Sequence, residues 1–251
     1  MSGHSHWAKI KRAKASTDAK RGRLWSKLAR KIIVAAKAGG GKPEDNLQLR
    51  YAIDEAKAAN MPNDTIDKAI KKGTGELGAN TYEQVVYEGY GPGGVAFIVD
   101  CLTDNRNRTA PEMRKIFERA GGQLGASGCV AWMFESKGTF VVAAEKADEE
   151  TLMEIALEAG ADDVAAEGDL FELTCEAGAF GPVKQALAER KIETVSAEIA
   201  MIPKTSVTVD ADKARQVLNL MESLEDHDDV QNVYANFDIP DEIMAEAENQ
   251  A

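Results

Sequence analysis

The apolar residues of the sequence change their spacing at GTGELGAN, residues 73–80, and this change limits the folds open to the chain. Before it, apolar side chains recur every three to four residues, which is the period of an α-helix. After it, short apolar runs typical of strands alternate with helical stretches. A chain of 251 residues is also long enough for more than one hydrophobic core. The sequence therefore predicts an α+β protein that begins with a helical domain.

Three helices are expected in that first domain, over 16–39, 43–59 and 62–72. Pro43 and Pro62 suit helix starts, and glycines at 39–41 and 73 suit helix ends. On a helical wheel, one sector of the first helix holds its apolar residues, Leu24, Trp25, Leu28, Ile32, Ala35 and Ala36. The opposite sector holds cations, with Arg21 as the exception: Lys20, Arg23, Lys27, Arg30, Lys31 and Lys37. The helix can bury one face and present a row of positive charge on the other.

The rest of the chain reads as two interleaved α+β patterns. Strands over 81–90 and 95–102, a helix over 109–120 and a strand over 129–134 give ββαβ. Residues 138–203 then follow the βαββαβ order of a ferredoxin-like unit, and a helix over 211–224 with a strand over 230–238 completes the earlier pattern. We therefore expect a helical domain at 1–78, a discontinuous α+β domain at 79–135 and 204–240, an inserted ferredoxin-like domain at 136–203, and an acidic tail at 241–251.

Positive charge is concentrated at the start of a chain whose formal net charge is -12. Met1 to Lys42 contains 12 Lys and Arg residues and one acid, Asp18. Through Gly75 there are 17 basic and 7 acidic residues, against 13 basic and 35 acidic residues in the remainder. Like charges at that density repel each other unless a polyanion is near, so the pattern favours nucleic-acid binding over a merely solvated helix face.

Two groups of residues are candidates for that contact. The first lies between residues 4 and 31 and includes Trp7, and the second lies in the loop DNRNRT. Trp7 can either stack on an exposed base or pack back on the helical domain. The loop DNRNRT contains a second candidate set, although its arginines can instead pair with local acids while Thr109 caps a helix. The first set comprises His4, His6, Trp7, Lys9, Lys11, Arg12, Lys14, Lys20, Arg21, Arg23, Lys27, Arg30 and Lys31, and the second comprises Asn105, Arg106, Asn107 and Arg108.

Other classes of site find little support in the sequence. YGPGG lacks a following GK[ST] and leads into a strand, so it predicts a hairpin turn, and GGQLGASG predicts a flexible connection. Three distant cysteines without CxxC spacing argue against disulfides or zinc and suit a reducing cytoplasm. A start at Ser2-Gly3-His4 could bind Cu(II), without an evident role. We expect no enzyme activity, no cofactor, no metal site and no membrane span.

Several blocks of the sequence resemble, in order and spacing, those of the YebC family, which includes the mitochondrial translational activator of cytochrome oxidase. They are GHSHWAKIKRAK, DAKRGRLWSKLARKI, AAKAGGGKPEDN, MPNDTIDKAIKKG, YEGYGPGGVAFIVDCLTDNRNRT and VQNVYANFDI. The resemblance implies three domains and a non-enzymatic role, either in transcription on DNA or in helping the ribosome through difficult stretches. The chain departs from the family at His6, commonly Lys there, and at Arg12, often His there.

The combined hypothesis is a cytoplasmic, non-enzymatic regulator of gene expression that binds nucleic acid. The expected partner is ribosomal RNA, with ribosomal proteins as additional partners and no obligate small molecule, and the expected role is in elongation through difficult sequences. One alternative is a transcriptional regulator that binds DNA. An alternative of another class is a small-metabolite sensor that uses the ferredoxin-like domain.

Overall fold

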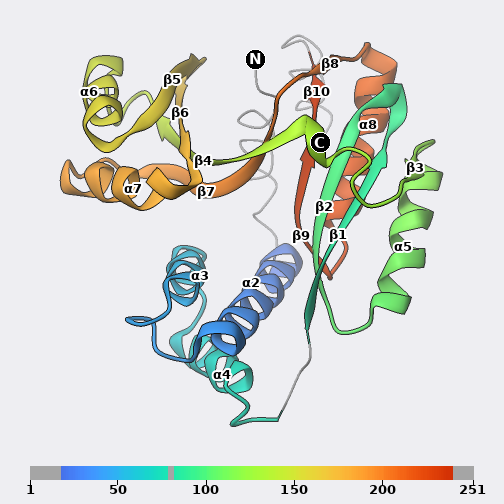
Figure 1. Ribbon diagram of the computed structural model, residues 1–251, viewed down its shortest axis with the longest axis horizontal. Coiled ribbons are helices and arrows are strands. Elements are labelled where there is room, and N and C mark those ends of the chain that lie inside the picture. Colours follow the sequence, from blue (N-terminus) through green and yellow to red (C-terminus); the bar gives the residue numbers. More distant parts are fainter. Residues whose placement is uncertain (1–17, 79–81, 240–251) are drawn as a thin grey trace. The chain divides into compact units, whose positions relative to one another are not determined.

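The computed structural model describes residues 18–78 and 82–239, and the chain forms two compact units (Figure 1). Of these residues, one unit comprises 18–78, 82–129 and 211–233, and the other comprises 130–210 and 234–239. The helical segment and the first α+β pattern thus share a unit. The division into three domains stays a prediction.

The helical segment contains α2 (Asp18–Gly39), α3 (Leu47–Ala58) and α4 (Asn63–Gly73). Their shared core includes Leu28, Ile32, Leu49, Ala56 and Ile66, each at most 4% exposed. Burial of this kind contributes roughly 1.5–3 kcal/mol for each large side chain. The predicted apolar face of α2 is confirmed at Leu28, Ile32, Ala35 and Ala36.

Two residues of that face deviate from the prediction. Leu24, expected to be buried, is 40% exposed, because it lies near the start of α2 where the core cluster does not extend. Trp25 is partly buried against the core, and its indole Nε1 donates to the carbonyl oxygen of Ala59 at 3.0 Å. That hydrogen bond ties α2 to the end of α3.

Asn46 determines where α3 begins. We expected this helix to start at Pro43, but its first residue is Leu47, because the Asn46 side chain caps the helix by accepting from the Leu49 backbone N–H at 3.1 Å. The same side-chain amide donates to the carbonyl oxygens of Ala35 at 2.8 Å and Gly40 at 2.9 Å. The buried Asn46 therefore joins the end of α2 to the start of α3.

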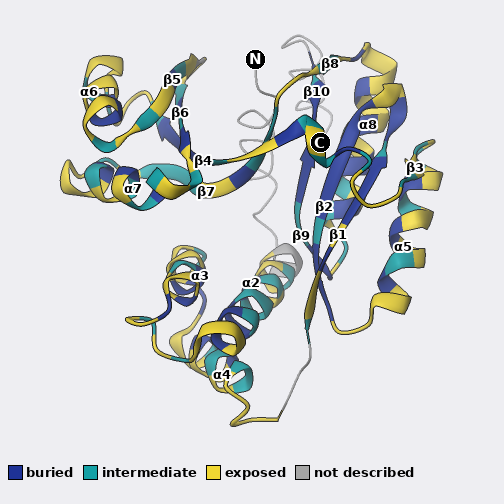
Figure 2. Ribbon diagram, in the orientation of Figure 1, coloured by how far each residue is buried: buried dark blue, intermediate teal, exposed yellow. Residues whose placement is uncertain are grey.

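A four-stranded sheet forms the α+β part of the same unit. Its strands run in the order β3 (Gln123–Leu124), β1 (Glu83–Tyr90), β2 (Ala96–Thr103), β9 (Val230–Ala235). The helices α5 (Arg106–Arg119) and α8 (Ala211–Glu225) pack with it, and Phe97 of β2 meets Phe117 of α5 edge to face at 5.9 Å between ring centroids. Figure 2 shows that buried residues dominate β1, β2 and β9, whereas α5 is exposed along one side.

The turns of this part confirm one prediction and overturn two. β1 and β2 pair antiparallel across Pro92–Gly94, as the YGPGG hairpin predicts. The strand expected at 129–134 is wrong, since Ala131–Met133 is a short 3₁₀ helix and the strand after α5 is β3. β3 lies inside GGQLGASG, which we expected to be a flexible connection. Its glycines instead permit close packing, because a Cβ on Gly122 would lie 2.5 Å from the Tyr90 carbonyl oxygen.

The other unit contains a second four-stranded sheet. It is built from β4 (Phe134–Ala143), α6 (Glu149–Ala159), β5 (Ala161–Glu167), β6 (Leu170–Glu176), α7 (Phe180–Glu189) and β7 (Thr194–Pro203). The strand order β5-β6-β4-β7, with every neighbouring pair antiparallel, is that of the ferredoxin-like pattern. Two short strands, β8 (Val207–Thr208) and β10 (Phe237–Asp238), pair in parallel in this unit.

The last predicted strand, 230–238, is divided at Asn236. β9 belongs to the first sheet, whereas β10 pairs with β8. The buried Asn236 lies between them, where its carbonyl oxygen accepts from Val207 N at 2.7 Å and its side-chain amide donates to Thr205 O at 3.2 Å. Directly after Asn236 the chain pairs with β8 as β10.

Replacing Asn46 by Ala should lower the free energy of unfolding by about 2–3 kcal/mol, because one cap and two buried hydrogen bonds are lost together. Urea unfolding followed by circular dichroism measures the change. Asn63→Ala, at the exposed first residue of α4, is the matched control. Equal stability of the two variants would contradict the role given to Asn46.

Candidate nucleic-acid interface

The row of cations predicted on α2 faces an acidic segment of the same unit. Arg23 pairs with Asp226 at 2.9 Å, and Lys27 donates to the carbonyl oxygen of Glu225 at 2.5 Å. These partners lie in the run EDHDD, residues 225–229, which follows the last turn of α8. Arg23 and Lys27 are therefore engaged within the protein.

This contact has a clear physical basis. The last carbonyl groups of a helix have no intrahelical partner, and the helix dipole places partial negative charge at the same end. Glu225 is the last residue of α8, so Lys27 satisfies one of these carbonyl oxygens. Arg30 donates to the Asp228 carbonyl oxygen just beyond, and Lys31 instead pairs with Glu55 of α3 at 3.0 Å. Part of the predicted interface thus serves as a cap for α8.

Asp229 joins three segments that are far apart in the sequence. Its side chain is 3% exposed and accepts from Arg108 at 2.7 Å and from the Thr109 hydroxyl at 2.8 Å, while Arg30 lies 3.6 Å away. Its backbone carbonyl oxygen accepts from the Leu102 N–H at 2.8 Å. Burial opposes ionisation of Asp229, but the hydrogen bonds from Arg108 and Thr109 outweigh it and hold the pKa of the carboxyl below its ordinary value.

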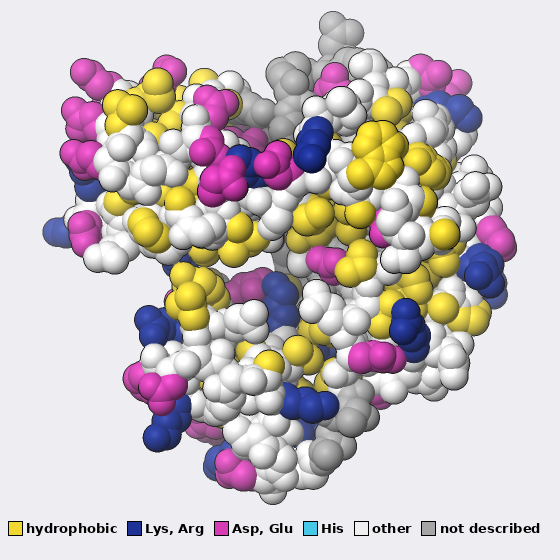
Figure 3. Space-filling model, viewed as in Figure 1, with side chains coloured by type: hydrophobic (Ala, Val, Ile, Leu, Met, Phe, Trp, Pro, Cys, Tyr) yellow, Lys and Arg dark blue, Asp and Glu magenta, His cyan; other side chains and the backbone are white. Residues whose placement is uncertain are grey.

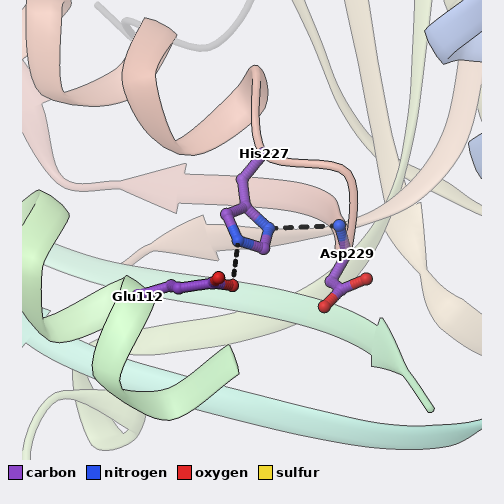
Figure 4. A group of neighbouring side chains, drawn as sticks. All are labelled: Glu112, His227 and Asp229. Atoms are coloured by element: carbon purple, nitrogen blue, oxygen red, sulfur yellow. Dashed lines mark hydrogen bonds and ion pairs between the residues drawn. The ribbon is translucent and has the colours of Figure 1, made fainter. Parts of the chain in front are cut away.

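Glu112, His227 and Asp229 form the one group of described residues whose spacing suits a metal ion (Figure 4). The His227 ring already has two partners, since its Nδ1 accepts from the Asp229 N–H at 3.1 Å and its Nε2 lies 3.0 Å from a Glu112 carboxylate oxygen. An accepting Nδ1 places the ring proton on Nε2, which donates it to Glu112. The Asp229 carboxylate accepts from Arg108 and from the Thr109 hydroxyl. All three side chains thus have partners within the protein.

The DNRNRT loop divides into structural and exposed residues. The Asn105 side chain accepts from the Arg108 N–H at 3.2 Å and caps α5, which begins at Arg106 and not at Thr109 as expected. Arg108 pairs with Asp229 and with Asp104 at 3.2 Å, in line with the alternative that these arginines serve the fold. Arg106 and Asn107 are exposed, so these two residues of the predicted second set lie open to a ligand.

Most of the predicted arm lies outside the described residues. These candidates are His4, His6, Trp7, Lys9, Lys11, Arg12 and Lys14, and the side chain of Lys20 is also outside the description. Arg21 is exposed on α2. The arm's contribution to binding stays a prediction.

Sequence reasoning overlooked the acidic run as the partner of the α2 cations. The signal was present, because EDHDD at 225–229 places four acids within five residues directly after a predicted helix. Nothing in the linear sequence brings residues 23–30 to residues 225–229, some 200 positions away. Only the folded chain brings them together, as the contacts of Arg23 with Asp226 and of Lys27 with Glu225 show.

The described cysteines do not offer a reactive thiolate. Burial raises the pKa of the Cys101 thiol to about 12 and also raises the pKa values of Cys129 and Cys175. All three are free, and Cys101 and Cys175 are buried. A protonated, buried thiol is a poor nucleophile. The expectation of a non-enzymatic protein stays a prediction.

The interior of the ferredoxin-like sheet and its helices is apolar. Phe140 stacks on Phe180 at 4.8 Å between ring centroids, and the side chains of Leu152, Ile155 and Leu173 are fully buried. A metabolite sensor needs a pocket with convergent polar groups, and this alternative stays a prediction. On the outer surface, Figure 3 shows Asp and Glu side chains gathered over α6. None of the described helices is long and apolar enough to span a membrane.

Replacing Asp229 by Asn should lower the free energy of unfolding by about 2 kcal/mol at pH 7, because charge-assisted hydrogen bonds to Arg108 and Thr109 are weakened. Since the folded-state pKa is depressed, the carboxylate stabilises the fold above its unfolded pKa of about 4. That stabilisation is lost as the pH falls through the folded-state pKa. Urea unfolding of wild type and variant from pH 7 down to acid should show the difference shrinking.

The neighbouring Asp228→Asn is the control, because its carboxylate is exposed and its contact to Arg30 uses the backbone oxygen. A change within about 0.5 kcal/mol is expected there. A difference between wild type and Asp229→Asn that stays constant with pH would contradict the electrostatic account.

Known proteins similar to the chain extend over nearly its whole length. A "Probable transcriptional regulatory protein" of Pelotomaculum thermopropionicum is 55% identical over 243 residues, covering 96% of this chain and 100% of the relative. One of the same name from Dictyoglomus turgidum is 54% identical over 245 residues, covering 97% and 98%. The crystal structure of a conserved hypothetical protein from Aquifex aeolicus, 48% identical, has a TM-score of 0.83 and covers 90% of this chain and 94% of that one.

Two family models match the chain. Residues 5–76 match the model described as the TACO1/YebC protein N-terminal domain, and residues 82–237 match the one described as the TACO1/YebC second and third domain. The two matches are consecutive, and together with relatives more than half identical to the chain they confirm the resemblance in the signature blocks. The chain belongs to the TACO1/YebC family.

Proposed function

We propose that the protein is a YebC-type regulator of gene expression that binds nucleic acid through residues 1–78. The observation that carries this proposal is the segregation of charge, with 17 basic and 7 acidic residues through Gly75 in a chain of net charge -12. A basic segment of this density supplies the sequence-independent attraction that dominates nucleic-acid affinity. The acidic remainder of the chain is unsuited to the same ligand.

The types of cation left exposed indicate how the ligand is held. Three of the described arginines in the helical segment serve the fold: Arg23 and Arg30 bind the acidic run, and Arg50 donates to the carbonyl oxygens of Pro43 and Glu44. Arginine is the side chain that most often reads guanine by a bidentate contact. Lysines remain exposed, and lysine contacts phosphate as a point charge without reading sequence.

A binding mode based on phosphates favours a target recognised by shape. Structured RNA is such a target, since its deep major groove is closed to side chains and recognition relies on backbone and 2′-hydroxyl contacts. We therefore propose ribosomal RNA as the partner and a role in translation elongation. The names of the relatives favour a second candidate, a DNA-binding regulator of transcription.

Sedimentation of the full chain with ribosomal particles tests this proposal. At low salt the protein should migrate with the particles, and nuclease treatment should release it. Lys9→Glu, Lys11→Glu and Lys14→Glu combined should abolish migration, because reversed charges repel the phosphates. The matched control reverses three exposed cations of α5, Arg114, Lys115 and Arg119, and should leave migration intact.

Titration of labelled duplex RNA and duplex DNA of the same sequence distinguishes the two targets. Tighter binding of RNA supports the translational role. Tighter binding of DNA, together with a sedimentation profile that the arm variant does not change, would support the transcriptional role instead. Loss of three phosphate contacts in the arm variant should flatten the dependence of log affinity on log salt by about 2–3 units. Absence of salt-dependent binding to either duplex would refute nucleic-acid binding itself.

A further inference from the structure

We propose that four lysines at the C-terminal ends of α2 and α4 form a phosphate-binding surface, distinct from the predicted arm and from the row of cations that faces α8. The inference rests on the nucleic-acid binding proposed above and identifies which described residues carry it. We call this group the lysine cluster, and its members are Lys37, Lys42, Lys71 and Lys72.

Close packing of glycines brings these lysines together from positions about 30 residues apart in the chain. A Cβ on Gly73 would lie 2.5 Å from the carbonyl oxygen of Ile33 and 2.7 Å from the Ala36 side chain, so the end of α4 lies directly on the last turns of α2. The Ile33 carbonyl accepts within α2 from the residue four positions on, which is Lys37. Lys37 therefore lies beside the contact, and Lys72 immediately precedes Gly73.

A second glycine contact adds Lys42. A Cβ on Gly41 would lie 2.8 Å from the methyl group of Thr74 and 3.2 Å from the Ile70 side chain. The turn after α2 thus packs against the end of α4, and Lys42 follows that contact directly. Relative to the buried Ile66 and Ala69, Lys71 lies on the outer side of α4 and is exposed, whereas Lys72 lies at the flank of the helix and is half-buried.

The lysine cluster has no intramolecular partner in the part of the chain that the structure describes. Its four ammonium groups make no ion pair or side-chain hydrogen bond there, in contrast to Lys27 and Lys31. They are not needed as caps either. The Ala35 carbonyl is satisfied by Asn46, the Ala36 carbonyl by the Gly40 N–H, and the Ile70 and Lys71 carbonyls by the backbone N–H groups of residues 74 and 76.

The net positive charge of the lysine cluster still favours an anion after the helix dipoles and the nearby acids are taken into account. Each helix C-terminus carries about half a negative charge, so two of them cancel about one of the four lysines. The acids nearest in sequence, Glu44, Asp45 and Glu76, form no ion pair with the cluster, and Glu76 accepts from the Thr74 hydroxyl at 2.9 Å. The packed helix ends fix the backbone positions of these lysines, so phosphate contact has to order only their side chains.

Two glycine turns beside the lysine cluster leave the backbone uncovered by side chains. Gly40 and Gly75 have positive φ values of 86° and 88°, and neither has a neighbouring atom within 4 Å of where a Cβ would stand. These two turns flank the lysines without side chains of their own, so a sugar-phosphate backbone can approach closely. The ligand that fits is the phosphate backbone of structured RNA, contacted without base readout.

Salt titration of labelled duplex RNA binding by the full chain tests the proposal. The test variant replaces Lys37, Lys42, Lys71 and Lys72 by Gln, a good helix former that removes charge without reversing it. The matched control also removes four cations, by Arg114→Gln, Lys115→Gln, Arg119→Gln and Lys204→Gln, all at exposed positions. Circular dichroism of both variants verifies that the fold is retained.

The cluster variant should flatten the slope of log affinity against log salt by about 3 units and weaken binding at low salt by about tenfold or more. The control should keep a slope within one unit of wild type. If wild type binds RNA and both variants keep its slope, or both lose it equally, the lysine cluster is refuted while the proposed function stands. If wild type shows no salt-dependent binding, the proposed function itself fails.

Discussion

The buried carboxylate of Asp229 is the interaction on which the arrangement of the larger unit depends. It holds Arg108 and Thr109 at the start of α5, lies close to Arg30 of α2, and its backbone bonds to β2. A carboxylate that is 3% exposed is tolerable only because donors surround it, and removing one such donor leaves charge uncompensated. The same donors lower the pKa of Asp229, so the ionised form is the one that binds these segments together.

That constraint changes the interpretation of the basic segment. The cations of α2 that seemed suited to phosphates contact the C-terminal end of α8 and the acids beyond it, which resemble phosphates in charge but belong to the fold. Several cations of both types thereby serve the structure, among them Arg23, Lys27 and Arg108, whereas Lys37, Lys42 and Lys71 stay exposed and Lys72 is half-buried. A surface of lysines alone favours attraction to a backbone over recognition of a sequence, consistent with a regulator that binds structured RNA.

Much of the fold could be predicted from periodicity and turn residues. The helical start, the hairpin at YGPGG and the βαββαβ order follow from patterns that reflect local backbone preferences. The errors occurred where tertiary contacts override those preferences. Pro43 suggested a helix start that the Asn46 side chain places four residues later, and a glycine-rich stretch became β3 because Gly89 and Gly122 let two backbones approach. The strand expected at 129–134 failed because periodicity alone does not distinguish a strand from a helical turn in so short an apolar run, and Ala131–Met133 forms a 3₁₀ helix.

By itself the sequence determined the charge segregation, the α+β composition and, through its signature blocks, the family, because these properties depend on residue identity and local spacing. Which cations remain available to a ligand was decided only by the tertiary structure. Lys27 and Lys37 are alike in sequence terms, ten residues apart on one basic helix, yet one contacts α8 and the other lies at an open helix end. The difference arises because charge interactions depend on distance in space, and the acidic run at 225–229 lies against Arg23 and Lys27 of α2 but forms no contact with Lys37.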